Sequence, residues 1–364
     1  MKNLLGNLAL AAGSLVLTLG LLEIMLAFMP VTGVARTQVL SSTGRPFDVA
    51  STPNASVTYS DTWRMRNPLV KATNNFGFFS DFDYTPRARI VVAIGDSYTE
   101  AAQVEFENTF HQRAARLTGH EIYNFGLSGA PLSQYEAYLD QACATFQPQA
   151  AVFAVIHNDF DESFRAHRSR AGFFHYADNA PHALAPTPYE ISTLRRLVTK
   201  SNLVRYLFFN MHLRHYVRTY TSGSSSNHNV EISFSGSSNV DIRIKRAAID
   251  RFLAQVGEKC LDPSQIIFLA DSDRESLYTG ITRRDAAMLY FLETARAGGF
   301  QVVDLHTHFA AAWRKHGKAF ETSSDAHWDR SGHRVVGEAL AEVLSLQRFK
   351  PDPARRTTAR AAQQ

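Results

Sequence analysis

The stretch RIVVAIGDS, residues 89–97, decides the fold. Its first six residues are mostly β-branched and apolar, which is typical of a buried strand, and Gly95-Asp96-Ser97 predicts a turn directly after it. A helical pattern follows over residues 110–117. Strand and helix patterns then alternate along much of the chain, which favours a parallel sheet with helices on both faces. We therefore expect an α/β fold in which Ser97 stands where the first strand ends.

The later elements repeat this alternation, with one long interruption. Strands are expected at residues 122–125, 150–156, 266–270 and 301–305, and helices at 132–146, 242–256, 284–297 and 334–346. Residues 160–240 do not fit the pattern, and we expect a lid-like insertion there. It contains an amphipathic helical pattern over 194–216 and a flexible Ser/Gly/Asn-rich loop at 222–227.

The composition is that of a globular protein with a large core. The chain has 364 residues, of which 45% are hydrophobic and 20% charged, with a formal net charge of +4. Because the basic residues are concentrated only in the tail, nucleic acid is not an expected partner. We expect one main domain, at 87–348, and a disordered basic tail at 349–364.

The N-terminal residues predict a membrane anchor. Residues 4–28 are almost all apolar, and a run of about 25 residues is long enough to cross a bilayer. We expect a transmembrane segment at 1–30, with Glu23 reaching the interface, and a turn-rich stalk at 31–86. Cleavage as a signal peptide after the small residues at 33–35 is the alternative. The few flanking basic residues leave the orientation open.

The candidate catalytic residues lie at opposite ends of the main domain. A serine after a strand is presented into the crevice at the carboxyl edge of a parallel sheet, but it needs a base to become a nucleophile. His327 is the candidate base, and Asp325, two residues upstream, can orient its imidazole. We expect Asp96 to accept hydrogen bonds from loop N–H groups and His333 to have a packing role.

Two further loops supply candidate donors for an oxyanion hole. Gly129 follows the second predicted strand, and Asn158-Asp159 follows the third. A tetrahedral oxyanion needs preorganised donors, which the backbone amides of Ser97 and Gly129 and the side-chain amide of Asn158 can provide. Asp159 is expected to support this loop.

These residues, in this order, resemble the SGNH (GDSL-like) hydrolase superfamily over about residues 89–346. The resemblance places the family's blocks on Gly95-Asp96-Ser97, on Gly129, on Asn158-Asp159, and on Asp325 with His327. An Asn-x-x-Gly-Phe element at 74–78 and the apolar N-terminus resemble membrane-anchored bacterial members related to polysaccharide O-acetylesterases and O-acetyltransferases. The chain departs from the family at Ile156, where glycine is usual, and at Ser324, which takes the usual carboxylate position.

The resemblance implies a doubly wound, flavodoxin-like sheet of five parallel strands in the order 2-1-3-4-5. It also implies a serine-dependent esterase acting on O-acyl groups, above all O-acetyl groups, of cell-surface carbohydrate through an acyl-enzyme. An O-acetyltransferase of exopolysaccharide or cell wall is the alternative, and a non-catalytic carbohydrate-binding or assembly component is the second. No metal or other cofactor is expected. The His306-x-His308 pair is expected only to begin a helix, because too little chain follows to complete a metal site.

The same strand order makes Cys143 and Cys260 candidates for a disulfide, because their helices become neighbours. A disulfide favours an oxidising compartment. We therefore expect a single-pass protein of the inner (cytoplasmic) membrane with its catalytic domain on the periplasmic side. The expected partners are an acylated carbohydrate or another small ester, the lipid bilayer, and membrane proteins that synthesise polysaccharide or donate acyl groups.

Overall fold

The computed structural model of the chain describes residues 2–33, 39–40, 47, 49–87, 89–164, 172–177, 180–187, 193, 200–211, 213, 241–271, 273–280, 284–322 and 326–346. The chain divides into two compact units. The smaller unit comprises Met1–Ala35, Ser56–Lys71 and Glu190–Glu231, and the larger unit comprises Arg36–Ala55, Ala72–Tyr189 and Ile232–Gln364. The predicted catalytic residues all belong to the larger unit.

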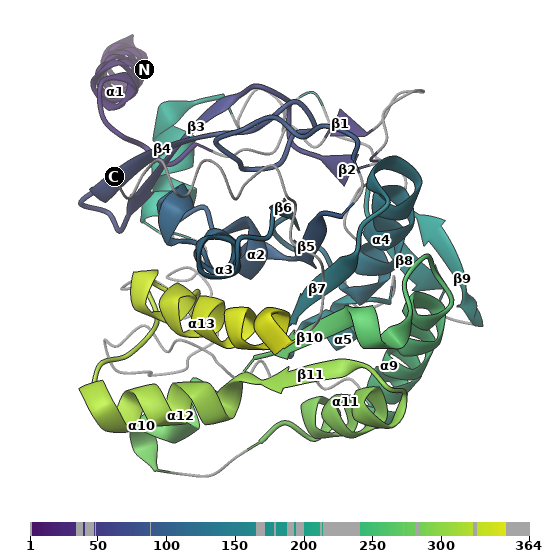
Figure 1. Ribbon diagram of the computed structural model, residues 1–364. Coiled ribbons are helices and arrows are strands. Elements are labelled where there is room, and N and C mark those ends of the chain that lie inside the picture. Colours follow the sequence, from purple (N-terminus) through teal and green to yellow (C-terminus); the bar gives the residue numbers. More distant parts are fainter. Residues whose placement is uncertain are drawn as a thin grey trace. The chain divides into compact units, whose positions relative to one another are not determined.

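The larger unit is built on a five-stranded parallel sheet (Figure 1). The strands are β5 (Val91–Gly95), β6 (Ile122–Gly126), β7 (Ala150–Val155), β10 (Ile266–Ala270) and β11 (Gln301–Asp304). Their spatial order is β11-β10-β7-β5-β6, so the predicted order 2-1-3-4-5 is confirmed. Gly95 pairs with Gly126 in the register of β5 and β6, and the loops after these strands therefore start at the same edge of the sheet.

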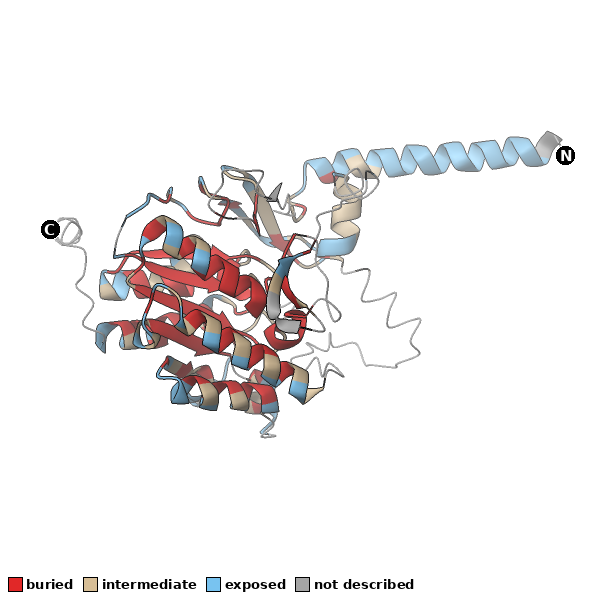
Figure 2. Ribbon diagram, turned by 90° about the vertical axis from the view of Figure 1, so that its right-hand side faces the viewer, coloured by how far each residue is buried: buried red, intermediate tan, exposed pale blue. Residues whose placement is uncertain are grey.

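Helices cover both faces of the sheet, and alternate strand residues feed two separate cores. The helices are α3 (Phe110–Thr118), α12 (Leu305–His316) and α13 (Arg330–Leu346) on one face, and α4 (Leu132–Phe146), α9 (Ile242–Gly257) and α11 (Ala286–Ala297) on the other. In β5, for example, Val91 and Ala93 face the first core while Val92 and Ile94 face the second. Strands β5, β6, β7 and β10 are buried along their whole length, whereas the edge strand β11 is partly exposed. Figure 2 shows buried strands between helices whose outer sides are exposed.

Short helices complete the larger unit: α2 (Ser97–Glu100), η1 (Phe106–Asn108), α5 (Asp159–Glu162), η3 (Pro263–Gln265) and α10 (Arg274–Thr279). The predicted elements agree with the observed ones to within a few residues. The last helix, α13, differs most, because it starts at Arg330 and not at 334. Asp329 explains the earlier start, since its carboxylate accepts hydrogen bonds from the N–H groups of Ser331 and Gly332, both at 2.8 Å.

Part of the segment predicted as a stalk, residues 31–86, packs on the core of the larger unit. Phe47 stacks on Phe125 with ring centroids 4.7 Å apart, and Tyr84 stacks on Tyr123 at 4.0 Å. The short strands β1 (Val39–Leu40) and β2 (Val49–Ala50) also belong to the larger unit. Turn-rich sequence shows no periodicity, so only the sheet beneath these rings reveals that they are core residues.

The Asn-x-x-Gly-Phe element forms a tight turn that fixes this segment to the core. The side-chain oxygen of Asn74 accepts hydrogen bonds from the N–H groups of Phe76 (3.0 Å) and Phe78 (3.1 Å). Gly77 has φ +86°, and a Cβ on it would lie 2.1 Å from the carbonyl oxygen of Ser51. Any other residue at 77 would therefore force the turn away from the core.

Cys143 and Cys260 form a disulfide across one face of the sheet. Cys143 lies in α4, Cys260 lies shortly after α9, and their Cα atoms are 5.9 Å apart. The bond joins residues 117 positions apart in sequence. It closes a loop that contains β7 and the whole predicted insertion.

The insertion residues 172–177 and 180–187, which belong to the larger unit, pack on the body of that unit. Strands β8 (Phe174–Ala177) and β9 (Ala180–Pro186) pair antiparallel. The hydroxyl of Ser133 in α4 donates to the carbonyl oxygen of Phe174 at 2.9 Å, and the hydroxyl of Tyr176 donates to Glu136 at 3.2 Å. The loop at 222–227 and the tail at 349–364 lie outside the described residues.

The smaller unit contains the apolar N-terminal helix α1 (Lys2–Ala27), strands β3 (Ser56–Asp61) and β4 (Arg66–Ala72), the single turn α7 (Asn202–Arg205) and the π-turn η2 (Tyr206–Asn210). The helical segment Leu4–Ala27 is long and apolar enough to cross a membrane. Figure 2 shows α1 exposed along almost all of its length. The described residues of the helix predicted over 194–216 form mainly α7 and η2.

Candidate active site

The structure brings Ser97 and His327 into direct contact, although they lie 230 positions apart in sequence. Ser97 is the first residue of α2, immediately beyond the end of β5. The Nε2 atom of His327 lies 2.7 Å from the Oγ atom of Ser97, a distance at which the hydroxyl can donate its hydrogen to the imidazole. The ring of Tyr98 lies against the imidazole, with centroids 4.8 Å apart.

Gly129 lies in a loop that a buried carboxylate ties to α2. Glu100, one turn after Ser97 in α2, accepts a hydrogen bond from the N–H of Ser128 at 3.0 Å. Gly129 has φ +81°, the left-handed region that favours glycine. Gly126 lets the two loops approach, because a Cβ there would lie 2.2 Å from the backbone nitrogen of Glu100. The Gly129 loop is thus tied to the helix that carries Ser97.

Asn158 and Asp159 follow β7 at the same edge of the sheet. The side-chain amide of Asn158 donates to Glu162 at 3.1 Å, and the second hydrogen of that amide is the one that can serve a ligand. Asp159 is fully buried and accepts hydrogen bonds from the N–H of Ile156 (2.8 Å) and the hydroxyl of Tyr135 (3.1 Å). Burial raises the pKa of the Asp159 carboxyl well above its usual range, and the nearby Asp96 carboxylate adds to this shift.

A buried arginine holds the backbone just before His327. The guanidinium of Arg274 pairs with the carboxylates of Asp271 and Glu321 and donates a hydrogen bond to the carbonyl oxygen of Ala326 at 2.7 Å. The hydroxyl of Tyr98 donates to the same carbonyl at 2.9 Å. Burial opposes the positive charge, but the two carboxylates outweigh it and raise the pKa of Arg274. The backbone at Ala326 is therefore fixed by two side chains from other loops.

Further hydrogen bonds surround His327 on both sides along the chain. Its carbonyl oxygen accepts from the N–H of Thr322 at 2.9 Å, and the carbonyl of Trp328 accepts from the side chain of Gln103 at 3.1 Å. The indole N–H of Trp328 donates to Asp271 at 3.2 Å. Because the backbone is held on each side, the imidazole has little freedom to leave Ser97.

Asp96 lies beneath this pair and is almost fully buried. Its Oδ1 accepts from the N–H of Tyr98 at 2.9 Å, the structural role expected for it. Burial raises the pKa of Asp96 from its ordinary value of 3.8 to about 6, while the hydrogen bond from Tyr98 and the charge of His327 act in the opposite direction. Asp96 is thus an ionisable group within the site whose charge changes in the mildly acidic range.

Of the predicted site residues, the structure brings together Ser97, His327 and Asp96, and it places the Gly129 and Asn158–Asp159 loops at the same edge of the sheet. Asp325 and Ser324 lie outside the described residues. His333 is fully buried, and its Nδ1 accepts a hydrogen bond from the N–H of Phe110 at 3.2 Å.

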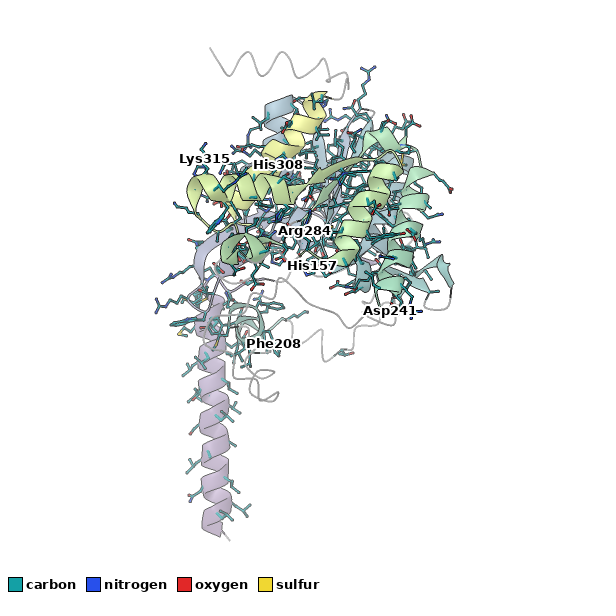
Figure 3. All side chains as sticks on the ribbon, turned by 90° about the horizontal axis from the view of Figure 1, so that it is seen from below. His157, Phe208, Asp241, Arg284, His308 and Lys315 are labelled. Atoms are coloured by element: carbon teal, nitrogen blue, oxygen red, sulfur yellow. A yellow bond between two sulfur atoms is a disulfide. The ribbon has the colours of Figure 1, made fainter. Side chains whose placement is uncertain are left out.

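The histidines of the His-x-His pair lie at the start of α12; His308 is labelled in Figure 3. The carboxylate of Asp304, just before them, accepts the N–H of His306 at 3.1 Å and pairs with Arg284 at 2.8 Å. Asp304 therefore caps the helix and forms an ion pair at the end of β11. Within the described ranges, no group of three or more His, Cys, Asp or Glu side chains is arranged to hold a metal ion.

Sequence reasoning missed the residues that support the site: Glu100, Asp271, Arg274 and Glu321. Asp271 directly follows β10, and this position after a strand is the same signal that pointed to Ser97, Gly129 and Asn158. Arg274 lies only three residues after Asp271, but its contacts with Glu321 and Ala326 are distant in sequence and gave no local signal.

Comparison with protein-family models finds a match over the segment that carries the serine of this site. The family model described as GDSL-like Lipase/Acylhydrolase matches residues 91–203, which include Ser97, Gly129 and Asn158. The sheet topology and the match to this family model together indicate the class of the protein, which is an enzyme that hydrolyses ester bonds. More particularly, this match confirms the resemblance to GDSL-like lipases and acylhydrolases over residues 91–203, which are less than a third of the chain.

Several solved structures resemble the chain at low identity. A member of the lipolytic G-D-S-L family from Veillonella parvula is 10% identical, with a TM-score of 0.40, and the match covers 72% of this chain and 100% of that one. A lipase/acylhydrolase from Enterococcus faecalis is 12% identical (TM-score 0.39; 72% and 98% covered). A catalytic mutant of an acetylxylan esterase from Geobacillus stearothermophilus is also 12% identical (TM-score 0.38; 73% and 99% covered). No curated protein matches the chain.

Proposed function

We propose that this protein is a serine-dependent esterase that removes O-acyl groups, in particular O-acetyl groups, from cell-surface carbohydrate. The observation that carries the proposal is the 2.7 Å contact between the Oγ of Ser97 and the Nε2 of His327. A serine within hydrogen-bond reach of an imidazole, in a domain of the ester-hydrolysing class, is the arrangement that nucleophilic acyl transfer needs.

In the proposed first step, the Oγ of Ser97 attacks the ester carbonyl carbon while its hydrogen passes to the Nε2 of His327. The new Oγ–carbon bond produces a tetrahedral oxyanion, which the N–H groups of Ser97 and Gly129 and the side-chain amide of Asn158 stabilise. Collapse of this intermediate breaks the carbon–oxygen bond to the sugar. His327 returns the proton to the departing alkoxide, and the acyl group stays on Ser97.

In the second step, His327 takes a proton from water as the water oxygen bonds to the acyl carbon. The bond between that carbon and the Oγ of Ser97 then breaks, His327 returns the proton to the Oγ, and a carboxylic acid is released. Asp325 is proposed to orient the Nδ1–H of the imidazole in both steps. Asp96 and Asp159 support the loops without transferring protons. A sugar hydroxyl in place of the water would turn the same chemistry into acyl transfer, so the two activities share every residue of the mechanism.

The location belongs to the same proposal. The apolar α1 supports a membrane anchor, and the disulfide between Cys143 and Cys260 supports an oxidising compartment. We therefore place the GDSL-like domain, residues 87–348 together with the packed residues upstream, on the periplasmic side of the cytoplasmic membrane. The carbohydrate substrate and the acyl-donating membrane partners rest on the resemblance to membrane-anchored bacterial members.

Labelling with a fluorophosphonate probe tests the nucleophile. The wild type and a Ser345→Ala control should be labelled, because the Ser345 hydroxyl only bonds the carbonyl of Ala341 in α13. Ser97→Ala should not be labelled, and hydrolysis of a chromogenic acetyl ester should fall roughly 10⁴- to 10⁶-fold in Ser97→Ala and His327→Ala. Labelling that does not depend on Ser97, or no labelling, would favour a non-catalytic binding protein.

A second assay separates the esterase from the transferase. The release of acetate from a chromogenic acetyl ester is measured with and without an oligosaccharide acceptor. An esterase should release the same amount of acetate in both reactions. Acetylated oligosaccharide formed at the expense of acetate would instead identify the transferase.

A further inference from the structure

The exposed aromatic side chains of the described residues are concentrated in the smaller unit. Phe28, Trp63, Phe208 and Phe209 all belong to it, and their exposed fractions are 86%, 56%, 42% and 39%. Among the described residues, no Phe or Trp of the larger unit is as exposed. Isolated exposed apolar residues are ordinary, but four aromatic rings gathered in so small a unit mark an interaction surface.

Within this unit, a polar contact ties α7 to the C-terminal end of α1. The carboxylate of Glu23 accepts four hydrogen bonds: from the hydroxyl of Ser201 (2.7 Å), from the backbone N–H (2.6 Å) and side-chain amide (3.0 Å) of Asn202, and from the N–H of Leu203 (2.9 Å). Glu23 thus satisfies backbone N–H groups at the start of α7 that have no partner within that helix.

This contact fixes the depth of α7 relative to α1. Glu23 stands four residues before the end of α1 at Ala27, which corresponds to about 6 Å along a helix axis. If Leu4–Ala27 crosses a bilayer, the start of α7 lies at the level of the last turn of the apolar helix and not beyond it. Residues 201–210 are therefore held at the depth of the membrane–water interface.

The other end of this segment is held as firmly. The side chain of Asn210 accepts the N–H of Thr32 at 3.0 Å and donates to the carbonyl oxygen (3.2 Å) and the hydroxyl (3.0 Å) of Ser60. The hydroxyl of Tyr206 donates to the carbonyl oxygen of Trp63 at 2.9 Å. Phe208, labelled in Figure 3 beside the end of α1, is thus carried on a turn with fixed ends, and so is Phe209.

The charges of the unit have the sign that suits an anionic lipid surface. Its exposed charged side chains, within the described ranges, are Arg64, Arg66 and Lys200, which are all basic. The guanidinium of Arg64 lies 4.8 Å from the ring centroid of Trp63. Aromatic and basic side chains together are characteristic of protein surfaces at the membrane interface.

We propose that the smaller unit is a lipid-contacting collar, made of α7, η2 and the β3–β4 turn, which inserts Trp63, Phe208 and Phe209 into the interface around the end of α1. This inference rests on the proposed role of α1 as a membrane anchor. It adds that α1 stays part of the mature protein, because its removal would leave the start of α7 without the Glu23 carboxylate. The partner is the headgroup region of an anionic bilayer.

Fluorescence quenching by brominated lipid tests the collar. The full-length protein is placed in vesicles of phosphatidylcholine and phosphatidylglycerol with bromine near the headgroup end of the acyl chains. The wild type and the control Trp313→Phe, a change in α12, should be quenched, and Trp63→Phe should lose the lipid-dependent quenching. Equal quenching of wild type and Trp63→Phe would overturn the collar. So would a Trp63 protected from both lipid and aqueous quencher, which would indicate a protein dimer.

Hydrogen exchange tests the link to α1. In Glu23→Ala, exchange of the amides of Asn202 and Leu203 should accelerate at least about tenfold, because their charge-assisted bonds are lost. Unchanged exchange would contradict the contact.

Extraction with alkaline carbonate separates the collar from the membrane anchor. Protein that stays in the membrane with an unquenched Trp63 refutes the collar alone. Release by carbonate refutes the anchor and the collar together.

Discussion

Replacement of Arg274 tests whether the buried ion-pair network sets the catalytic geometry. The guanidinium is fully buried, pairs with Asp271 and Glu321, and donates to the carbonyl oxygen of Ala326, the residue before His327. Two substitutions separate its charge from its shape. Arg274→Met removes the charge, and Arg274→Lys keeps the charge but loses the planar fork that reaches three partners.

The expected loss of stability follows from the carboxylates left behind. Removal of one partner of a buried ion pair costs about 3–5 kcal/mol, because the other charge stays buried without compensation. We expect the lower part of this range for Arg274→Met, since Trp328 still donates to Asp271 and Tyr278 still donates to Glu321 at 2.8 Å. Arg274→Lys should cost less, because a cation remains beside both carboxylates.

The expected effect on catalysis is separate from stability. Without the bond from Arg274, only Tyr98 holds the carbonyl of Ala326, and the imidazole of His327 can move away from Ser97. A misplacement of about 1 Å can lower a rate about 10²-fold. We therefore expect kcat for a chromogenic acetyl ester to fall about 10²-fold in both variants. KM should stay nearly unchanged, because the Gly129 and Asn158 loops are held by Glu100 and Glu162 and not by Arg274.

The assay combines urea unfolding with steady-state kinetics on the full-length protein in detergent. Arg330→Lys is the matched control, since Arg330 lies three residues after His327 but forms an exposed pair with Glu105. An exposed pair contributes about 1 kcal/mol or less, so this control should keep both stability and kcat. If Arg274→Lys folds and retains the kcat of the wild type, the proposed clamp on His327 is refuted.

Three further predictions concern the pH response, the disulfide and the Gly129 loop. Because the pKa of Asp96 is raised on folding, the folded protein binds more protons than the unfolded chain between pH 3.8 and about 6, and the contribution of Asp96 to stability should decrease as the pH rises through that range. Urea unfolding should therefore show that Asp96→Asn gains stability relative to wild type between pH 4 and pH 7. A difference that stays constant with pH would contradict this. Replacement of Cys143 and Cys260 by alanine should lower the free energy of unfolding by about 2–5 kcal/mol, and a reductant should reproduce this loss in the wild type only. Gly129→Ala and Gly119→Ala, at φ +81° and +75°, should each cost about 1–2 kcal/mol of stability, but only Gly129→Ala should lower kcat, because Gly119 ends α3 with nothing within 4 Å of an added Cβ.

Local sequence patterns determined the sheet and the positions of the candidate residues. A buried parallel strand is a short apolar run whatever surrounds it, so β5 and the four later strands could be recognised from their own residues. Because parallel strands end at one edge, Ser97, Gly129 and Asn158 could be assigned to that edge before any contact was known. The pairing of the two cysteines rested on the strand order that the family resemblance implied.

The tertiary structure alone decided what holds these residues in place. The bond from Tyr98 to Ala326 spans 228 positions, the bond from Glu23 to Ser201 spans 178, and neither has a periodic pattern to announce it. Hydrogen bonds and ion pairs between distant loops depend on where the folded backbone passes, not on neighbouring residues. The chain's own pattern therefore predicted where a serine and a histidine would stand, while Arg274, Glu100 and the Glu23 contact became visible only when the fold brought their partners within reach.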